Sequence, residues 1–137
     1  MAVYRVEFNV RSSQRFQLID ITDRVEDAVR ESGISNGIAH VFVPHATAAV
    51  IANEHESGLM NDILSVIKTL FPPEHGWMHN RIDNNAHAHL ASSIIGASRT
   101  FPVVNGRLLR GTWQNIFVVE LDGPRYSRTV IVTVIGD

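Results

Sequence analysis

The chain has 137 residues, 45% of them hydrophobic and 19% charged, which fits one globular domain that buries a core without cross-links. Twelve basic and fourteen acidic residues give a net charge of -2, which argues against a nucleic-acid or acidic-membrane partner. The chain has no cysteine, so disulfides and thiolate ligands are excluded, and a transition metal must be held by imidazoles and carboxylates.

Taken in chain order, residues 4–10 and 16–20 alternate apolar and polar positions, as half-buried strands do. This start lacks the basic segment and apolar block of a signal peptide, and no apolar run approaches the ~20 residues that span a bilayer. We therefore expect a cytoplasmic protein, with residues 1–137 forming one domain. Thr22 is predicted to cap a helix over 23–32 that ends at Gly33.

Residues 38–43 and 46–52 are apolar and rich in small or β-branched side chains, which predicts two buried strands. Asn53 is a good N-cap for the helix that follows, with Glu56 completing a capping box. The apolar face of this helix is predicted to contain Leu59, Ile63, Val66, Ile67 and Leu70.

A further helix is predicted over 85–95, and the last third of the chain is all strand. Residues 101–104 lead into Asn105-Gly106, the pair favoured in two-residue hairpin turns, and strands follow over 113–121 and 129–135. The order of elements predicts an α+β fold, a mostly antiparallel sheet packed with about three helices.

Polar residues interrupt this pattern at two places in the first half of the chain. His45 and Thr47 lie in an apolar run and point to one face of an extended segment. His45 is either a structural histidine bonded to backbone or part of a functional site. Glu54 and Asp62 are predicted on the face of their helix opposite the apolar stripe. There they serve either as solvated, dipole-stabilising charges or as functional carboxylates.

Histidines recur in the second half. His79 lies in a polar loop, and His87 and His89 follow in the helix predicted to begin at Asn85. Residues two apart on a helix point in nearly opposite directions, so His87 and His89 cannot easily bind one ion together. His89 shares a face of small and polar residues with Asn85, which makes it the functional candidate. If the segment were a strand, both histidines could face one site.

Two arginines follow the turn predicted at Asp122-Gly123-Pro124. Arg125 and Arg128 could anchor a phosphorylated ligand through their bidentate guanidinium groups, or form an edge-strand charge pair. The chain has no Walker loop, dinucleotide fingerprint, HExxH or nucleophile elbow. Taken alone, the residues indicate histidines and carboxylates that could converge.

Together these segments resemble the YjbQ-type (UPF0047) family. HATAAVIANEH (45–55) is similar to the family's H-T-T-A…N-E motif, and GRLLRGTWQ (106–114) and DGPRYSR (122–128) also match in order and spacing. Two positions depart from the family pattern. Ala46 replaces a usual Thr, and His87 stands where an acidic residue is common, which puts any carboxylate role there in doubt.

The resemblance implies a compact α+β homotrimer with a histidine-lined polar pocket that can hold a metal or an anion. It also implies a weak, secondary thiamine-phosphate synthase activity, which couples hydroxymethylpyrimidine pyrophosphate to thiazole phosphate and releases pyrophosphate. Carried over by position, the expected catalytic residues are His45, His79, His89, Glu54, Asp62 and Asn85. The expected residues for binding a phosphorylated substrate are Thr47, Gln114, Arg125 and Arg128.

The identity of a metal stays open at this point. Three neutral imidazoles from His45, His79 and His89 would suit zinc, whereas a magnesium–pyrophosphate complex would favour the oxygens of Glu54 and Asp62. Two alternatives to the synthase stay open as well. One is a metal- or anion-binding trimer without turnover, and the other is a metal-dependent hydrolase that uses a histidine-bound water.

Overall fold

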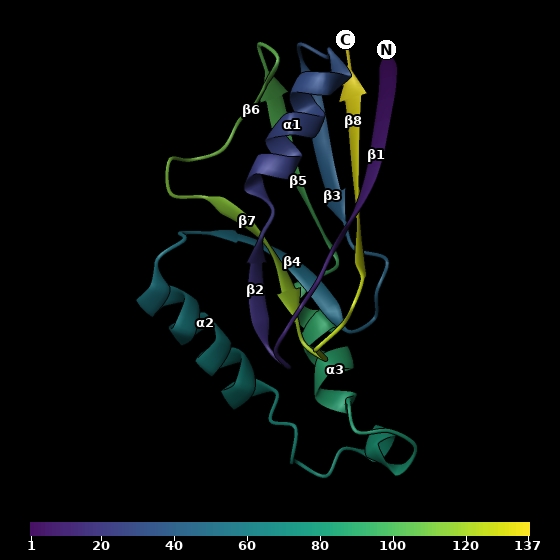
Figure 1. Ribbon diagram of the computed structural model, residues 1–137, viewed down its shortest axis with the longest axis vertical. Coiled ribbons are helices and arrows are strands. Elements are labelled where there is room, and N and C mark those ends of the chain that lie inside the picture. Colours follow the sequence, from purple (N-terminus) through teal and green to yellow (C-terminus); the bar gives the residue numbers. More distant parts are fainter.

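A computed structural model describes all residues 1–137 as two antiparallel sheets and three α-helices (Figure 1). The five-stranded sheet has the spatial order β1 (Ala2–Val10), β8 (Arg128–Gly136), β3 (Gly37–Phe42), β5 (Ser98–Val104) and β6 (Arg107–Leu108). The three-stranded sheet has the order β2 (Gln17–Asp20), β7 (Asn115–Glu120) and β4 (Ala48–Asn53). The helices are α1 (Thr22–Ser32), α2 (Ser57–Leu70) and α3 (Ala86–Ile95), with a short 3-10 helix over Met78–Arg81.

The two ends of the chain lie side by side in the five-stranded sheet. β1 pairs with β8 along its whole length, from Ala2 opposite Gly136 to Val10 opposite Arg128. Both termini are therefore at the top of Figure 1, beside α1. β8 also pairs with β3, so the strand formed last in the sequence occupies an interior place in the sheet.

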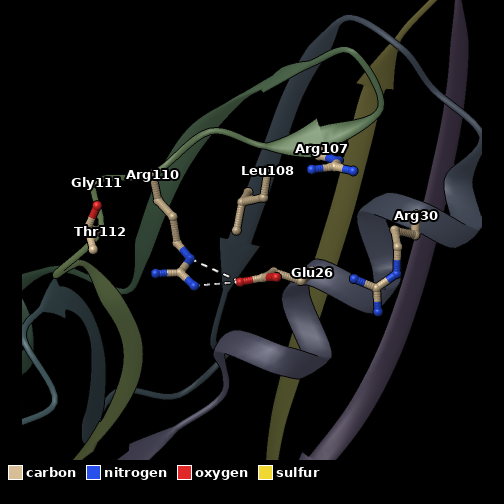
Figure 2. A pocket seen from close by; sticks show the side chains of 7 residues that line it. All are labelled: Glu26, Arg30, Arg107, Leu108, Arg110, Gly111 and Thr112. Carbon is tan, nitrogen blue, oxygen red and sulfur yellow. Dashed lines mark hydrogen bonds and ion pairs between the residues drawn. The ribbon is translucent and has the colours of Figure 1, made fainter.

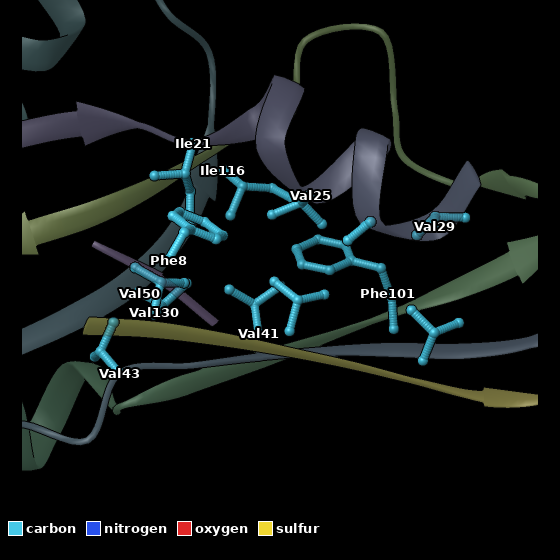
Figure 3. Close-up of a cluster of buried hydrophobic side chains, with 14 of the residues drawn as sticks. Phe8, Ile21, Val25, Val29, Val41, Val43, Val50, Phe101, Ile116 and Val130 are labelled. Atoms are coloured by element: carbon cyan, nitrogen blue, oxygen red, sulfur yellow. The ribbon is translucent and has the colours of Figure 1, made fainter. Parts of the chain in front are cut away.

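The three-stranded sheet is covered on both faces, which explains the apolar run in β7. Ile116 and Val118 belong to a core shared with α1 and the five-stranded sheet, part of which is drawn in Figure 3. Phe117 and Val119 point the other way, into a second core that includes residues of α2 and α3. A strand buried on both faces has no polar positions to alternate with, so its sequence is continuously apolar.

The apolar stripe predicted for α2 is not buried as a unit. The helix packs on the second core through Met60, Ile63, Leu64 and Ile67, of which Ile67 alone is fully buried. Val66 and Leu70 are 55% and 63% exposed. Both residues lie on the predicted apolar face of the helix, with Leu59, Ile63 and Ile67, but no other part of the chain covers them, which leaves an apolar groove open.

Both predicted N-caps were also wrong. Thr22 is the first residue of α1 and Ile21 is the N-cap, without a side-chain capping bond, while Asp20 accepts the Thr22 N–H and the Thr22 hydroxyl hydrogen. Asn53 is the last residue of β4, and α2 begins only at Ser57. Glu56 is the N-cap itself, accepting the backbone N–H groups of Gly58 and Leu59. β7 also begins later than predicted, at Asn115, because residues 113 and 114 belong to a turn.

The predicted α+β class is confirmed: a compact domain with mostly antiparallel strands and three helices. Helix α3 begins directly after Asn85 and ends before Gly96, as expected. None of the helices is long and apolar enough to cross a membrane.

Candidate functional site

A line of polar contacts starts in the 3-10 helix and ends in the loop between β7 and β8. His79 Nε2 lies 3.2 Å from Asn85 Oδ1, and Asn85 Nδ2 donates to Asp122 Oδ2 over 2.9 Å. Arg125 Nη2 also donates to that Asp122 oxygen, at 2.8 Å. A carboxylate only accepts, so the Asn85 amide group must face Asp122 and its oxygen must face His79. The hydrogen on His79 is thereby fixed at Nε2, and Nδ1 is left for a ligand.

His89 joins His79 at the edge of a cavity. The two rings meet edge to face with centroids 4.8 Å apart. The cavity has a volume of about 460 Å³ and is lined by Trp77, Met78, His79, Ala86, His89 and Leu90. It therefore combines two imidazoles with an apolar wall, a combination common in sites for small ligands.

His87 points to the opposite side of α3 and is fully buried. Its Nε2 donates to the carbonyl oxygen of Leu121 over 3.0 Å, and its ring packs on Phe16. Burial lowers the pKa of this imidazole, more than the hydrogen bond to Leu121 raises it. The helical geometry thus separates a packed histidine from the one that borders a cavity.

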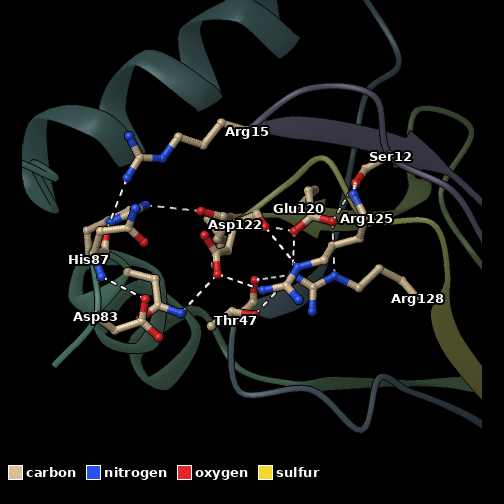
Figure 4. A network of polar contacts seen from close by, with 12 residues as sticks. Ser12, Arg15, Thr47, Asp83, His87, Glu120, Asp122, Arg125 and Arg128 are labelled. Atoms are coloured by element: carbon tan, nitrogen blue, oxygen red, sulfur yellow. Dashed lines mark hydrogen bonds and ion pairs between the residues drawn. The ribbon is translucent and has the colours of Figure 1, made fainter. Parts of the chain in front are cut away.

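A buried ion pair, shown in Figure 4, supports the loops around this line of contacts. Arg128 and Glu120 are 3% and 0% exposed and are joined by two hydrogen bonds, one of them from Arg128 Nε over 2.9 Å. The guanidinium also donates to the carbonyl and hydroxyl oxygens of Thr47, both at 3.0 Å. Ser12 donates to Glu120, and the backbone N–H of Asp122 does so at 3.0 Å.

These contacts determine the charge of Glu120. Burial raises the pKa of this carboxyl, but the hydrogen bonds from Arg128 and Ser12 outweigh burial and hold the pKa below its ordinary value. Arg128 and Thr47, expected to bind substrate, are therefore occupied by a structural network. Arg125, with a side chain 46% exposed, is the arginine of the pair that stays open to solvent.

His45 is held by the backbone of β8. Its Nε2 accepts the N–H of Thr129 over 2.8 Å, so this nitrogen carries no hydrogen while the bond is present. Burial and the positive charge of Arg128 lower the pKa of His45, with Glu120 opposing them. His45 is therefore a neutral imidazole near pH 7, and only its Nδ1 is left to face a ligand.

The other expected site residues lie elsewhere in the chain. The register of β4 with β7 pairs Ala48 with Glu120 at one end and Asn53 with Asn115 at the other. Glu54 and Gln114 lie just past the second pair, so they are separated from Thr47 by more than the length of the strand, which is about 16 Å. Asp62 lies on α2, at the edge of the apolar groove. One chain does not bring these three residues to the histidines.

The structure adds residues that sequence reasoning did not select. Asp122 was noticed only as part of a turn, although it joins Asn85 to Arg125. Glu120 ends an apolar strand and gave no signal, because its partner Arg128 is supplied by the next strand. A third addition is His55, whose Nδ1 lies 2.6 Å from Asp20 Oδ2 at the far end of the three-stranded sheet.

The histidines and carboxylates of one chain do not form a complete site for a divalent metal. His79 and His89 are neighbours, but nowhere in the chain are three or more His, Asp or Glu side chains grouped to hold an ion. A zinc site needs three or four protein ligands, so one chain does not complete it. The metal expected at His45, His79 and His89 stays a prediction, and no chemical step is assigned to it.

Comparison with known proteins identifies the family. The model of the family described as "UPF0047 protein YjbQ-like" matches residues 6–137. The chain belongs to this family. A UPF0047 protein of Methanothermobacter thermautotrophicus is 48% identical over 136 residues, covering 99% of this chain and 94% of the relative. The UPF0047 protein YugU of Bacillus subtilis is 38% identical over 128 residues, covering 93% of this chain and 96% of YugU.

Solved structures of the family share the fold. A YbjQ-like protein of unknown function from Sulfolobus solfataricus is 55% identical and covers 99% of both chains, with a TM-score of 0.98. A hypothetical protein from Aeropyrum pernix is 49% identical with a TM-score of 0.94, covering 97% of this chain and 98% of the other. The family and fold are thus established, and the names of these relatives specify no activity.

Proposed function

We propose that the cavity bordered by His79 and His89 binds a phosphorylated small molecule and releases pyrophosphate from it, as in thiamine-phosphate synthesis. The observation that carries this proposal is the fixed line from His79 through Asn85 and Asp122 to Arg125. It joins the His79 imidazole, in the wall of a mostly apolar cavity, to the solvent-exposed guanidinium of Arg125, which lies outside the lining. In such a site the Arg125 guanidinium offers hydrogen-bond donors to an anion, His79 Nδ1 accepts a hydrogen bond from a donor group of the ligand, and the apolar wall packs on a ring.

The proposed reaction asks little covalent chemistry of the protein. The thiazole nitrogen attacks the methylene carbon of the pyrimidine, the C–O bond breaks, and pyrophosphate leaves with the electron pair. The positive charge that develops on the pyrimidine side and the negative charge on the leaving group must both be accommodated. His89 and Arg125 would stabilise the departing anion, and Trp77 and Met78 would pack against the heterocycle.

We further propose that the chain works as a homotrimer. The support is an apolar face on α2, α3 and the loop between them, where the exposed side chains are Val66, Leu70, Met78, Ile82, Leu90 and Ile94. An exposed apolar area of this kind is typical of an association surface. Met78 and Leu90 also line the histidine cavity, so an associated chain would lie beside the site. Asp62, on the same face, would then approach a neighbouring chain.

This placement favours one alternative function, an anion- or metal-binding trimer without turnover. In that case the cavity would be a binding site at the subunit boundary and His79 and His89 would act as ligands only. The trimer itself is tested by sedimentation equilibrium. Leu70→Arg should shift the protein to monomer, whereas Val3→Arg, at an exposed position on β1, should not.

The activity is tested by incubating the pure protein with both phosphorylated precursors and measuring thiamine phosphate, before and after chelator treatment. We expect product, and its complete loss in His89→Ala with the trimer intact. His40→Ala, at a histidine of β3 that is not part of the cavity lining, is the control and should stay active. Full turnover by His89→Ala would refute the site. If the unmodified protein gave no product, the synthase proposal would be refuted and the proposal of binding without turnover would stand.

A further inference from the structure

A second polar cavity lies between α1, β6 and the loop that leads to β7, at the opposite end of the molecule from α3 (Figure 1). Its volume is about 490 Å³, within the range of small-molecule sites. Three of its lining side chains are arginines, Arg30, Arg107 and Arg110, against one carboxylate, Glu26. This is a local excess of positive charge in a chain whose net charge is -2.

Each arginine reaches the cavity from a defined place in the fold. Glu26 and Arg30 are four residues apart on α1 and so share one face of the helix. Arg107 follows the hairpin turn and is fixed by its pairing with Val104. Arg110 lies in the loop after β6, and Figure 2 shows its guanidinium turned toward Glu26.

The carboxylate in the cavity is already paired with an arginine. Arg110 donates to Glu26 Oε1 through Nε over 3.0 Å and through Nη2 over 2.7 Å. This ion pair, in which two guanidinium nitrogens share one carboxylate oxygen, removes one charge of each sign and leaves Arg30 and Arg107 uncompensated by any carboxylate of the lining. Arg30 forms an exposed ion pair with Asp27, which is not among the lining residues, through a side chain that is 61% exposed, and Arg107 has no ion-pair partner.

We propose that this cavity binds a small molecule through a phosphate group, with Arg107 and Arg30 as its ligands. The two guanidinium groups arrive from different elements and not as one planar fork. A tetrahedral phosphoryl group presents oxygens in several directions and can accept from both, whereas a planar carboxylate is satisfied by a single fork. Thr112 adds a hydroxyl donor to the same lining. The site is separate from the histidine cavity and does not depend on the proposed synthase reaction.

The sequence supplies a reporter for this site. Trp113 follows Thr112 directly, and the chain has only one other tryptophan, so Trp77→Phe leaves Trp113 as the only indole. In this background, titration with inorganic pyrophosphate should give a saturable change in fluorescence, with calorimetry as a second measurement. Arg107→Ala and Arg30→Ala should each weaken binding about tenfold or more, as expected for loss of a charged hydrogen bond. Added NaCl should also weaken it.

Two control variants make the assignment specific. Arg24→Ala removes a guanidinium from the same helix, one that lies over the ring of Phe8, and should leave the affinity unchanged. Arg125→Ala perturbs the histidine cavity and should also leave it unchanged. Binding that is lost in Arg125→Ala but kept in Arg107→Ala would place the anion in the other cavity and overturn the proposal. Unchanged affinity in both Arg30→Ala and Arg107→Ala, or no saturable binding by calorimetry, would overturn it equally.

Discussion

Removing the guanidinium of Arg128 is expected to destabilise the domain strongly. In Arg128→Met the Glu120 carboxylate, which is 0% exposed, keeps its bonds from Ser12 and Asp122 but loses its only charge partner. Breaking a buried ion pair in this way costs about 3–5 kcal/mol. That is a large part of the about 5–15 kcal/mol by which domains of this size are stable. The carbonyl and hydroxyl of Thr47 lose their donor as well.

The free energy of unfolding is best measured by urea titration followed by circular dichroism, at one fixed protein concentration because association adds to apparent stability. Adding Glu120→Gln to Arg128→Met removes the unpaired charge and should restore about 2 kcal/mol or more. The reasoning would be refuted if Arg128→Met lost less than about 1 kcal/mol of unfolding free energy. It would also be refuted if the double variant were no more stable than Arg128→Met.

The loss in free energy of unfolding caused by Arg128→Met should also depend on pH. Without Arg128, burial raises the pKa of Glu120 above its ordinary 4.5, so the carboxyl is neutral and tolerated at low pH. The unmodified protein behaves in the opposite way: its Glu120 pKa is lowered, so it loses stability as the pH falls below 4.5. The stability gap between the two proteins should therefore narrow as the pH falls from 7 toward 4.5.

Three further predictions concern other contacts. Ser92→Ala removes the buried hydrogen bond to the carbonyl of Ala48 and should cost about 1 kcal/mol in urea unfolding, whereas Ser93→Ala, at the exposed neighbour, should cost almost nothing. Burial raises the pKa of Asp20, but hydrogen bonds led by Thr22 and His55 lower it to about 2. Its stabilisation, about 1 kcal/mol after allowance for solvent screening, is therefore present above pH 3.8 and lost as the pH falls toward 2, a loss that Asp20→Asn should not show. If zinc binds at the histidine cavity, its content by elemental analysis should fall in His79→Ala/His89→Ala, and an unchanged content would exclude these ligands.

The pattern of apolar and polar residues predicted helices and strands well wherever burial is uniform along the element. The alternating residues of β1 and β8 and the period of α3 predicted these elements to within a few residues, because each packs one face on a continuous core. Asn105-Gly106 likewise placed the β5–β6 turn correctly, since only such a pair adopts the left-handed backbone at both positions without strain.

Sequence reasoning misplaced residues where contacts between distant parts of the chain determine which side chains are buried. Val66 and Leu70 follow the helical period correctly, yet a period says nothing of which partner covers a face. Arg128 was grouped with Arg125 because both follow one turn, but strand geometry sends Arg128 inward to Glu120 and leaves Arg125 outside. Of the expected site, His79, Asn85, His89 and Arg125 come together in one chain. Glu54 and Gln114 do not, because the register of β4 and β7 places them past the far end of these strands, and Asp62 does not, because it lies on α2. Neither placement can be derived from the local sequence.

The order of the strands determines when the domain can fold during synthesis. β7 and β8 occupy the interior places of the two sheets, yet they are the last strands to leave the ribosome. Until then β1, β2 and β4 have no strand to pair with, and their apolar faces stay exposed. Only β3, β5 and β6 can associate earlier. The nascent chain therefore presents unpaired strand edges almost to the end of translation, the state in which a chain most needs protection by chaperones.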